Sequence, residues 1–478
     1  MVEIRSIAGT KFIHPEQETK MPFKLVERQF ISRQQYHEIP SEEFKQNVVF
    51  GKNILDRYDR LRKLKKARLP ESFIKTEQKL LDKAISASKE DLSKIIKYSR
   101  KSLNKDYRAG VNNFFTHAFK DEGIRKRYID LYRKYLKGLQ LSKRPKKLPI
   151  GIQSPTDMID AFIIFKKTIP NDLYLDMIIN NNKRFDETTQ ELRTQLLQFY
   201  DSPFVSAVRD FAIHHGIDVT DMNERMEELK KILAIYFDDS RAFTESKSAG
   251  FTYGTGQVTL STFLDIEEVM KPTFAHEIIH NLAGHSYRVQ IDEMATDFDA
   301  EDHSHAFYAV VPEKHGIGFY NNLRWLNEGL SDLISQEICP SKDPNIIYGD
   351  EKSLLKRVME TGKNQISIDL AYQSYFEEHN QKLPEDKQFP KTKIFLQTVS
   401  NSWSSGFLIR LDKLIRSYGR RSHSVIKEIN EHFSEIAPIL MRHESVDKVI
   451  PEARKILADG MKTQAAQRRL MDAIRGIK

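Results

Sequence analysis

The sequence has little cysteine and no long hydrophobic run, and each absence excludes a class of protein. Cys339 is the single cysteine among 478 residues, which excludes an intramolecular disulfide framework and a zinc site made of cysteine pairs. No apolar run approaches the ~20 residues that a membrane-spanning helix needs, so an integral membrane protein is excluded. The first five residues, MVEIR, offer no apolar segment for a secretory signal. We therefore expect synthesis in the cytoplasm, and signal-independent secretion is compatible with the sequence.

The composition favours a folded, globular chain. Hydrophobic residues make up 40% of the sequence, charged residues 30% and aromatic residues 10%, which is too apolar for a disordered chain. A chain of this length can bury two or three hydrophobic cores, so we expect more than one domain.

The net charge of +8 is unevenly distributed along the chain. Residues 51–100 contain 15 basic and 7 acidic side chains and residues 101–150 contain 14 and 4, so this block carries +18. Residues 1–50 are balanced, and the rest of the chain carries −10. Solvated helical faces are the simpler explanation, because no nucleic-acid motif accompanies the charge. The alternative is an acidic partner, a phosphate backbone or an anionic membrane surface that contacts residues 51–150.

The hydrophobic pattern predicts a mainly α protein of the α+β class. Residues 1–50 read as irregular, because three prolines punctuate short polar stretches. Residues 51–140 read as several amphipathic helices. One of these helices carries Tyr128 and Tyr132 at helical spacing, which we interpret as a stripe that faces the core.

The second half of the chain adds a few strands to the helices. A helix is expected to begin at Pro203, because proline suits the first turn. Residues 251–260 are rich in β-branched and aromatic side chains and are interrupted by Gly254 and Gly256. This pattern predicts a short hairpin or a bulged edge strand. Beyond residue 265 the helical pattern returns.

The segment TFAHEIIHNLAG at residues 273–284 carries the clearest chemistry. His276 and His280 are four residues apart, so on a helix they lie on one face and both imidazoles can reach one zinc ion. Glu277 lies about 100° further round the helix, where it can contact a water molecule on the metal without becoming a ligand. The proline before this segment and the glycine at its end suit a three-turn helix. Without a third ligand, a pair of hydrogen-bonded core histidines would explain the pattern equally well.

Three downstream histidines are less suitable as the third ligand. The motif in which a third histidine follows a glycine turn requires glycine at position 283 and histidine at position 286. The chain has alanine and serine there, so His285 does not fit. His303 and His305 are of the right residue type, but no spacing supports them.

Glu328, in the segment WLNEGLSD, is the best candidate for the third ligand. Its surroundings have a helical pattern, and Asp332 follows one turn later on the same face. A carboxylate at Asp332 can accept the free N–H of a liganding imidazole and fix its tautomer. Asn327 is a second candidate for this supporting role.

At these residues the chain resembles the gluzincins, the thermolysin-like superfamily of zinc metallopeptidases. Residues 327–332 are similar to the family segment in which a glutamate binds the metal and an aspartate orients the first histidine. The resemblance implies Zn²⁺ as the cofactor, held by His276, His280 and Glu328. The separation of 48 residues between His280 and Glu328 is longer than in thermolysin, so residues 285–320 are expected to form an insertion.

The resemblance also implies a domain organisation. We expect a basic helical N-terminal domain over residues 1–190, a zincin catalytic core over residues 191–340 and a helical C-terminal subdomain over residues 341–478. Residues 253–260 are similar to the edge strand along which these enzymes bind extended substrates. The resemblance is closest over residues 240–340 and does not extend to the N-terminal domain.

Other family features refine the expected activity. The Gly-x-Met-Glu-Asn segment of the aminopeptidase branch is missing from the sequence, which favours cleavage inside a protein or peptide substrate. Tyr320, eight residues before Glu328, lies roughly where thermolysin-like enzymes carry the tyrosine that stabilises the transition state. An ordinary half-buried aromatic is the alternative reading of Tyr320, and His315 and Tyr348 are weaker candidates for the same role.

Together these residues predict a zinc-dependent endopeptidase. Glu277 would act as the general base and Tyr320 would stabilise the oxyanion. Two alternatives stay open: a zinc hydrolase of another amide or a pseudoenzyme scaffold, and a basic binding module for acidic partners with a structural metal. A toxin or effector that acts inside another cell fits the residues, and so does a housekeeping peptidase.

Overall fold

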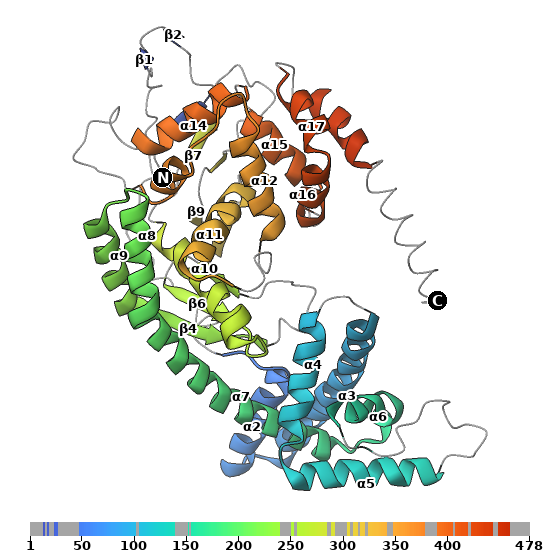
Figure 1. The fold of residues 1–478 in the computed structure, drawn as a ribbon. Coiled ribbons are helices and arrows are strands. Elements are labelled where there is room, and N and C mark those ends of the chain that lie inside the picture. The colour runs from blue at the N-terminus through green and yellow to red at the C-terminus, as the bar shows by residue number, and fades with distance from the viewer. Residues whose placement is uncertain are drawn as a thin grey trace.

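The structure is a computed structural model in which most of the chain is described. The described residues are 13–14, 17–18, 23–26, 47–101, 105–138, 152, 154–239, 250–252, 256–283, 288–291, 304–305, 309–313, 316–320, 324–341, 348–377, 390–404, 407–418, 422–442 and 448–458. Helices dominate these residues and the strands are short, so the predicted mainly α class is confirmed (Figure 1). None of the described helices combines the length and the apolar character that crossing a bilayer would require.

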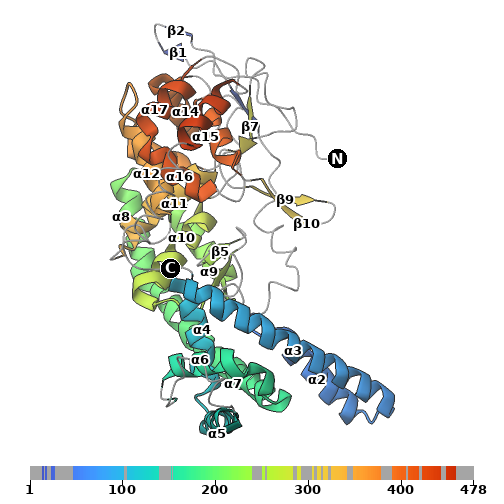
Figure 2. The ribbon, with the colours of Figure 1, turned by 90° about the vertical axis from the view of Figure 1, so that its right-hand side faces the viewer.

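The helices of the first half gather at one end of the molecule (Figure 1). They are α2 (Lys52–Lys66), α3 (Glu71–Lys101), α4 (Lys105–Ala118), α5 (Glu122–Gly138), α6 (Pro155–Phe165) and the long α7 (Asn171–Phe199). Buried side chains from residues 54–178 form one hydrophobic cluster, which we call the N-terminal core. Helices α2 and α3 pack together as a hairpin, the arm (residues 52–101), which projects from the molecule (Figure 2).

Local sequence signals explain two of these helices. Ser154 caps α6: its hydroxyl accepts from the Asp157 N–H, the Asp157 carboxylate accepts from the Ser154 N–H, and a proline follows the cap. In α5 the predicted stripe is confirmed, because Tyr128 and Tyr132 are buried in the N-terminal core. The Tyr128 hydroxyl donates to the Met158 carbonyl at 2.8 Å, which satisfies a polar group in this core.

The remaining helices surround a second hydrophobic cluster. They are α8 (Val205–His214), α9 (Val219–Ile232), α10 (Lys271–Leu282), α11 (Arg324–Ile338), α12 (Gly349–Glu360), α13 (Ile368–Tyr375), α14 (Pro390–Ser402), α15 (Phe407–Arg416), α16 (Ser422–Glu431) and α17 (Phe433–Leu440). Their buried side chains join others between Phe185 and Leu457, and Val49, in what we call the C-terminal core.

Helix α7 belongs to both cores. Its first half buries Leu173 and Ile178 in the N-terminal core, and its second half buries Phe185 and Leu196 in the C-terminal core. The predicted domain boundary after residue 190 therefore falls inside a continuous helix, and the change from one core to the other lies between Ile178 and Phe185.

The expected helix start at Pro203 is wrong. Helix α7 continues through a π-helical turn, Tyr200–Phe204, directly into α8. Proline has no N–H to donate and its ring crowds the preceding turn. The wider π turn accommodates the proline without ending the helix.

A small sheet packs beside the second group of helices. It consists of β4 (Ala234–Phe237), β5 (Gly250–Thr252) and β6 (Gln257–Leu260). Strand β6 pairs in parallel with β4 and antiparallel with β5, so the predicted hairpin is confirmed. The predicted edge position is wrong for residues 257–260, because β6 is the central strand and β5 forms an edge. Residues 253–255 lie outside the described residues. Gly256 opens β6 with a φ of 76°, and a Cβ there would lie 2.7 Å from Ile232.

Further short strands involve both the start of the chain and the expected insertion. They are β1 (Ile13–His14), β2 (Gln17–Glu18), β3 (Phe23–Val26), β7 (Arg288–Ile291), β8 (Ser304–His305), β9 (Ala309–Glu313) and β10 (Gly316–Tyr320). Residues 1–50 are thus not wholly irregular, because Phe-Lys-Leu-Val at residues 23–26 alternates apolar and polar side chains as strands do. Strand β3 pairs with β7, which lies within residues 285–320, so part of the first 50 residues lies against the expected insertion.

A buried polar cluster connects the two cores. The Asp239 carboxylate accepts a hydrogen bond from the Thr262 N–H at 2.8 Å and another from the Thr262 hydroxyl. Asn113, from α4, donates to the same hydroxyl at 3.2 Å. Burial raises the pKa of Asp239 to about 6, although the hydrogen bonds from Thr262 oppose this.

This raised pKa makes Asp239 a source of pH-dependent stability. Between its ordinary value of 3.8 and about 6 the folded chain binds more protons at this site than the unfolded chain, so stability falls as the pH rises through that window. We expect the unfolding free energy of the wild type, minus that of Asp239→Asn, to fall by about 2 kcal/mol from pH 4 to pH 7. Urea unfolding followed by tryptophan fluorescence measures this difference, and a pH-independent difference would contradict the assignment.

Candidate metal centre

Helix α10 carries two of the predicted ligands into the C-terminal core. It begins at Lys271, directly after a π-helical turn. The Asp265 carboxylate caps that turn by accepting hydrogen bonds from the Glu267 and Glu268 N–H groups. A proline occupies its first turn, and the helix runs for 12 residues, so the predicted three-turn helix is confirmed. Ile278 and Ile279 are completely buried, and they fix the helix against the core.

Helix α11 carries the third predicted ligand and packs directly against α10. Every residue from Trp325 to Ser335 is buried, so both faces of this part of the helix are covered. On one side α12 approaches so closely that a Cβ at Gly329 would lie 3.1 Å from the Glu351 carbonyl oxygen. Glycine after Glu328 therefore allows three helices to meet at this point.

The two helices bring three ligand-type atoms together. The Nε2 atoms of His276 and His280 lie 3.0 Å apart, and each lies 3.2 Å from the Oε2 atom of Glu328. His276 is completely buried, and the side chains of His280 and Glu328 are 8% and 5% exposed. The three residues that the sequence pattern selected as ligands are thus brought into one buried triangle.

This triangle fits a divalent transition metal. A tetrahedral zinc ion at about 2.0–2.1 Å from its ligands places the ligand atoms about 3.3 Å apart, close to the observed separations. Two imidazoles and one carboxylate are also the donor set of catalytic zinc sites, which leave a fourth position for water. Without an ion, two Nε2 atoms at this distance can interact favourably only when one of them is protonated.

The charges at the site favour the ligand form of the carboxylate. Burial raises the pKa of Glu328, but the hydrogen bonds and charges of His276 and His280 outweigh burial and hold that pKa well below its usual range. Burial lowers the pKa of His276, and the hydrogen bond to Glu328 together with the Glu277 charge reverses this effect, so the net shift is upward. Glu328 is therefore a carboxylate at neutral pH, while protons compete with a metal for His276.

The far side of His280 is held by a hydrogen-bonded group. Its Nδ1 atom lies 3.1 Å from the Ser331 hydroxyl, 3.3 Å from the Tyr375 hydroxyl and 3.4 Å from the Asn327 amide nitrogen. Ser331 donates to the Asn327 carbonyl at 2.9 Å and lies 2.6 Å from the Tyr375 hydroxyl. These contacts fix the ring so that Nε2 faces Glu328.

Two members of this group were not selected from the sequence. Ser331 lies one turn after Asn327 on the same helix, so the helical spacing places both side chains on one face. Tyr375 comes from α13 and no local pattern connects it to His280, although it is completely buried and burial raises its pKa well above the ordinary value. Asn327, which was selected, does lie against His280.

Asp332, the other predicted supporting residue, is buried next to Lys352. The two side chains form an ion pair at 3.3 Å. Burial raises the pKa of Asp332, and the charges of His276 and Lys352 oppose the shift. In the described part of the chain no hydrogen bond joins Asp332 to His276. The Asp332 Oδ1 atom and the His276 Nδ1 atom are each buried without a hydrogen-bond partner there. These two atoms are a complementary acceptor and donor.

Of the candidates for oxyanion stabilisation, Tyr348 lies at the metal centre, and the Tyr320 side chain lies outside the described residues. Tyr348 stacks on the His276 ring, with centroids 5.0 Å apart and the rings 29° from parallel. Tyr320 ends strand β10, four residues before α11, and its side chain lies outside the described residues. His285, His303 and His315 also lie outside the described residues, and His305 is described only as part of β8.

A second group of histidines has a different character. His215 is buried, and both its ring nitrogens lie 2.6 Å from carboxylate oxygens, one of Glu337 and one of Asp369. Both nitrogens are thus engaged in ion pairs that connect α8 to α11 and α13. His214 lies nearby and is exposed. We interpret this group as structural, because its ion pairs hold the three helices together.

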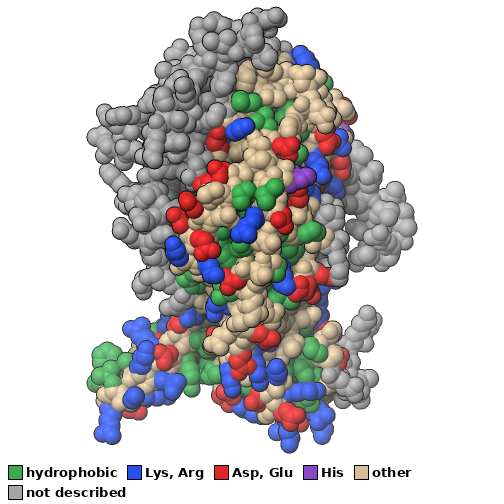
Figure 3. Space-filling view, turned by 60° about the vertical axis from the view of Figure 1, so that its left-hand side comes forward, with side chains coloured by type: hydrophobic (Ala, Val, Ile, Leu, Met, Phe, Trp, Pro, Cys, Tyr) green, Lys and Arg blue, Asp and Glu red, His purple; other side chains and the backbone are tan. Residues whose placement is uncertain are grey.

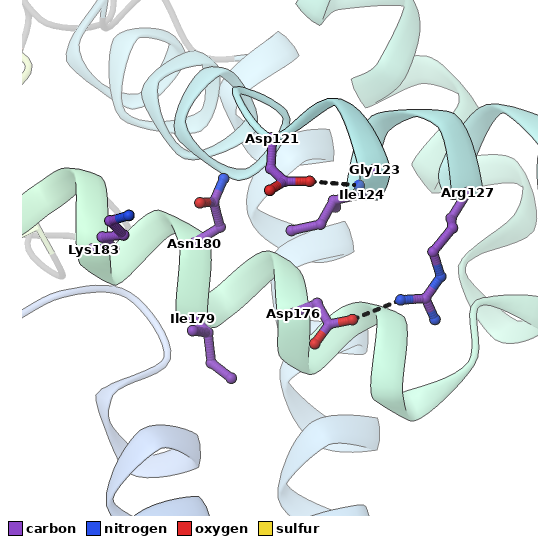
Figure 4. A pocket seen from close by; sticks show the side chains of 8 residues that line it. All are labelled: Asp121, Gly123, Ile124, Arg127, Asp176, Ile179, Asn180 and Lys183. Carbon is purple, nitrogen blue, oxygen red and sulfur yellow. Dashed lines mark hydrogen bonds and ion pairs between the residues drawn. The ribbon is translucent and has the colours of Figure 1, made fainter.

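The basic N-terminal helices contain a hollow of about 480 Å³ between α5 and α7 (Figure 4). Arg127 and Lys183 line it together with Asp121 and Asp176. Arg127 donates to Asp176 at 2.7 Å, and Asp121 accepts from the Ile124 N–H at 2.9 Å. Acidic and basic side chains balance one another here, so this hollow does not concentrate the positive charge of residues 51–150.

Comparison of the chain with protein-family models, with curated proteins and with solved structures gave no match. The geometry of the site and the chemistry of its residues therefore carry the assignment of a function.

The support behind His280 can be tested by removing one hydroxyl. In Tyr375→Phe the ring stays in place while the contacts to Ser331 and His280 are lost, and supporting groups of this kind change metal affinity by about 10–100-fold. We expect the dissociation constant for Zn²⁺, measured by competition with a chromophoric chelator, to rise about tenfold. Tyr372→Phe is the matched control, because Tyr372 is buried on the same helix and lies against His215. Equal effects of both variants would argue against a supporting role.

Proposed function

We propose that the protein is a zinc-dependent endopeptidase. The observation that carries this proposal is the buried triangle of two imidazole nitrogens and one carboxylate oxygen, contributed by two packed helices, with Glu277 next to the first ligand. The donor set, its burial and its dimensions all suit a catalytic zinc site. The proposal includes the thermolysin-like arrangement that the sequence resembles.

In this proposal His276, His280 and Glu328 hold the ion. When bound, zinc supplies Lewis acidity, which lowers the pKa of a water molecule and polarises the scissile carbonyl. Ser331 and Tyr375 keep the His280 ring in its liganding orientation. The low pKa of Glu328 keeps that side chain ionised, so it can offset the charge of the ion.

Glu277 is the proposed general base. It follows His276 on α10, so its side chain points about 100° away from the ligand direction and cannot complete the same triangle. Its charge contributes to raising the pKa values of His276 and Tyr375, which are both at the site, so its carboxylate lies close to the ligands. From there Glu277 would accept a proton from the attacking water and deliver it to the leaving amine.

Strand β5 is the proposed support for an extended substrate. It packs against α10 (Figure 2), and its one partner among the described strands is β6. Its other edge can therefore receive a peptide backbone by strand addition. Binding along the middle of a substrate chain is the mode expected of an endopeptidase. The sheet is attached to α10 by a hydrogen bond of 2.8 Å from the Gly256 N–H to the Asn281 side chain.

Metal dependence is the first test of this function. We expect the purified chain to contain about one zinc per molecule and to cleave peptides from a mixed library. A chelator should reduce cleavage to background, and about one equivalent of Zn²⁺ should restore it, because the ion is required for water activation. Metal content without any chelator-sensitive cleavage would favour the scaffold alternative instead.

The role of Glu277 gives the second test. Glu277→Gln keeps the size of the side chain and removes its basicity, so we expect kcat to fall by at least about 10²–10⁴-fold while zinc stays bound. Glu267→Gln is a matched control, because Glu267 lies exposed in the turn before α10 and is expected to leave kcat unchanged. Full activity in the Glu277→Gln protein would refute the mechanism, and metal analysis of both variants shows whether the site itself is intact.

A further inference from the structure

The end of the arm lies at the margin of the N-terminal core, where the half-buried Ile74 is the one apolar side chain of residues 62–80 that packs against it. Between Leu61 on α2 and Leu81 on α3 no apolar side chain is buried, so this part of the hairpin, residues 62–80, has no core of its own. We call it the arm tip. The chain reverses there through Arg68, which has a φ of 51°, and Pro70. Figure 2 shows the arm pointing away from the rest of the molecule.

The arm tip exposes large apolar side chains. Phe73 is 62% exposed, Leu69 is 42% exposed and Leu80 is 40% exposed. Phe73 and Leu80 are seven residues apart on α3, so they lie on one face of the helix. Only six large apolar side chains in the described part of the chain are exposed, and three of them lie here. Such a concentration at one projecting end indicates an interaction surface.

The same segment is strongly basic. Residues 62–80 contain seven Lys and Arg and two Asp and Glu, a net charge of +5. Two of the lysines have acidic neighbours, Lys63 with Asp59 and Lys75 with Glu71. Five exposed basic side chains form no ion pair with a described acidic residue, namely Arg62, Lys65, Lys66, Arg68 and Lys79. In Figure 3 the arm projects at the lower left, with hydrophobic and basic side chains side by side at its end.

The exposed apolar side chains and the unpaired basic side chains of the arm tip together indicate the kind of partner. A phosphate backbone would satisfy the lysines but would leave Leu69 and Phe73 in water. A groove on another protein would have to enclose a convex, highly charged end. The surface of an anionic bilayer satisfies both features, because its phosphates attract basic residues and its interface accepts apolar side chains.

We propose that the arm tip docks on the anionic surface of a lipid bilayer. Leu69, Phe73 and Leu80 enter the headgroup region, while Lys65 and Lys66 contact lipid phosphates. Such binding lies at the interface and does not span the bilayer. Because the arm points away from α10 and α11, docking places the bilayer at a distance from the helices that carry the candidate metal centre (Figure 2).

Cosedimentation of the full chain with vesicles tests this proposal. We expect binding to vesicles with 30% phosphatidylserine, at least tenfold weaker binding to pure phosphatidylcholine, and a steep loss of binding as salt rises from 50 to 500 mM. A chelator should leave binding unchanged, so the result is independent of the proposed peptidase activity. Equal binding to both vesicle types, or none at low salt, would overturn the proposal.

Matched variants locate the binding surface. Leu69→Ser with Phe73→Ser should weaken binding at least tenfold, whereas Ile213→Ser, on α8 and also 62% exposed, should have no effect. Lys65→Glu with Lys66→Glu should weaken binding at least twentyfold, since each nearby basic residue contributes roughly a factor of five. The same charge change at Lys126 and Lys134, exposed on α5, should alter binding less than threefold, and an equal loss there would overturn the location.

A fluorescent reporter adds evidence that does not depend on loss of binding. Trp325 and Trp403 are both buried, so the new indole in Phe73→Trp would be the exposed one. We expect its emission to shift to the blue with anionic vesicles, and spin-labelled lipid to quench it. Emission that stays unchanged while the protein sediments with vesicles would show that the arm tip is not the contact.

Discussion

The structure depends on keeping three polar side chains close together inside an apolar core. Two imidazoles and a carboxylate are unfavourable there unless their charges and hydrogen bonds are balanced. The surrounding residues provide this balance, because α11 packs on α10, Gly329 lets α12 approach, and Tyr375 from α13 reaches the far side of His280. Four helices are thus arranged around one potential ion position, and the sheet is attached to the same helix through Gly256 and Asn281.

The sequence predicted the parts of the site that follow from local geometry. His276 and His280 were recognisable because a helix places residues four apart on one face, and Glu328 because it lies in a helical segment with a recognisable pattern. Tyr375 was missed, since its contact with His280 joins residues 95 positions apart and no periodicity reports it. Asp332 was expected to accept a hydrogen bond from a liganding histidine. Its charge does act on His276, but its ion pair is with Lys352, which no sequence spacing indicates.

In the fold as well, the elements that follow from local pattern were predictable and the long-range pairings were not. Helical periodicity identified α5 and its buried tyrosines, and β-branched composition identified the β5–β6 hairpin. Strand order was not predictable, because β6 becomes central only through its pairing with β4, which lies earlier in the chain. The helix start predicted at Pro203 was wrong for a different reason: proline often occupies the first turn of a helix, but here a π turn accommodates it within a continuing helix.

Helix α7 has a consequence for how such a protein can arise and be engineered. Because one unbroken helix supplies side chains to both hydrophobic clusters, neither half can be exchanged by recombination at a simple linker. A gene fusion joined at residue 190 would separate Phe185 from the cluster that it fills. The two halves must therefore be transplanted as a single piece.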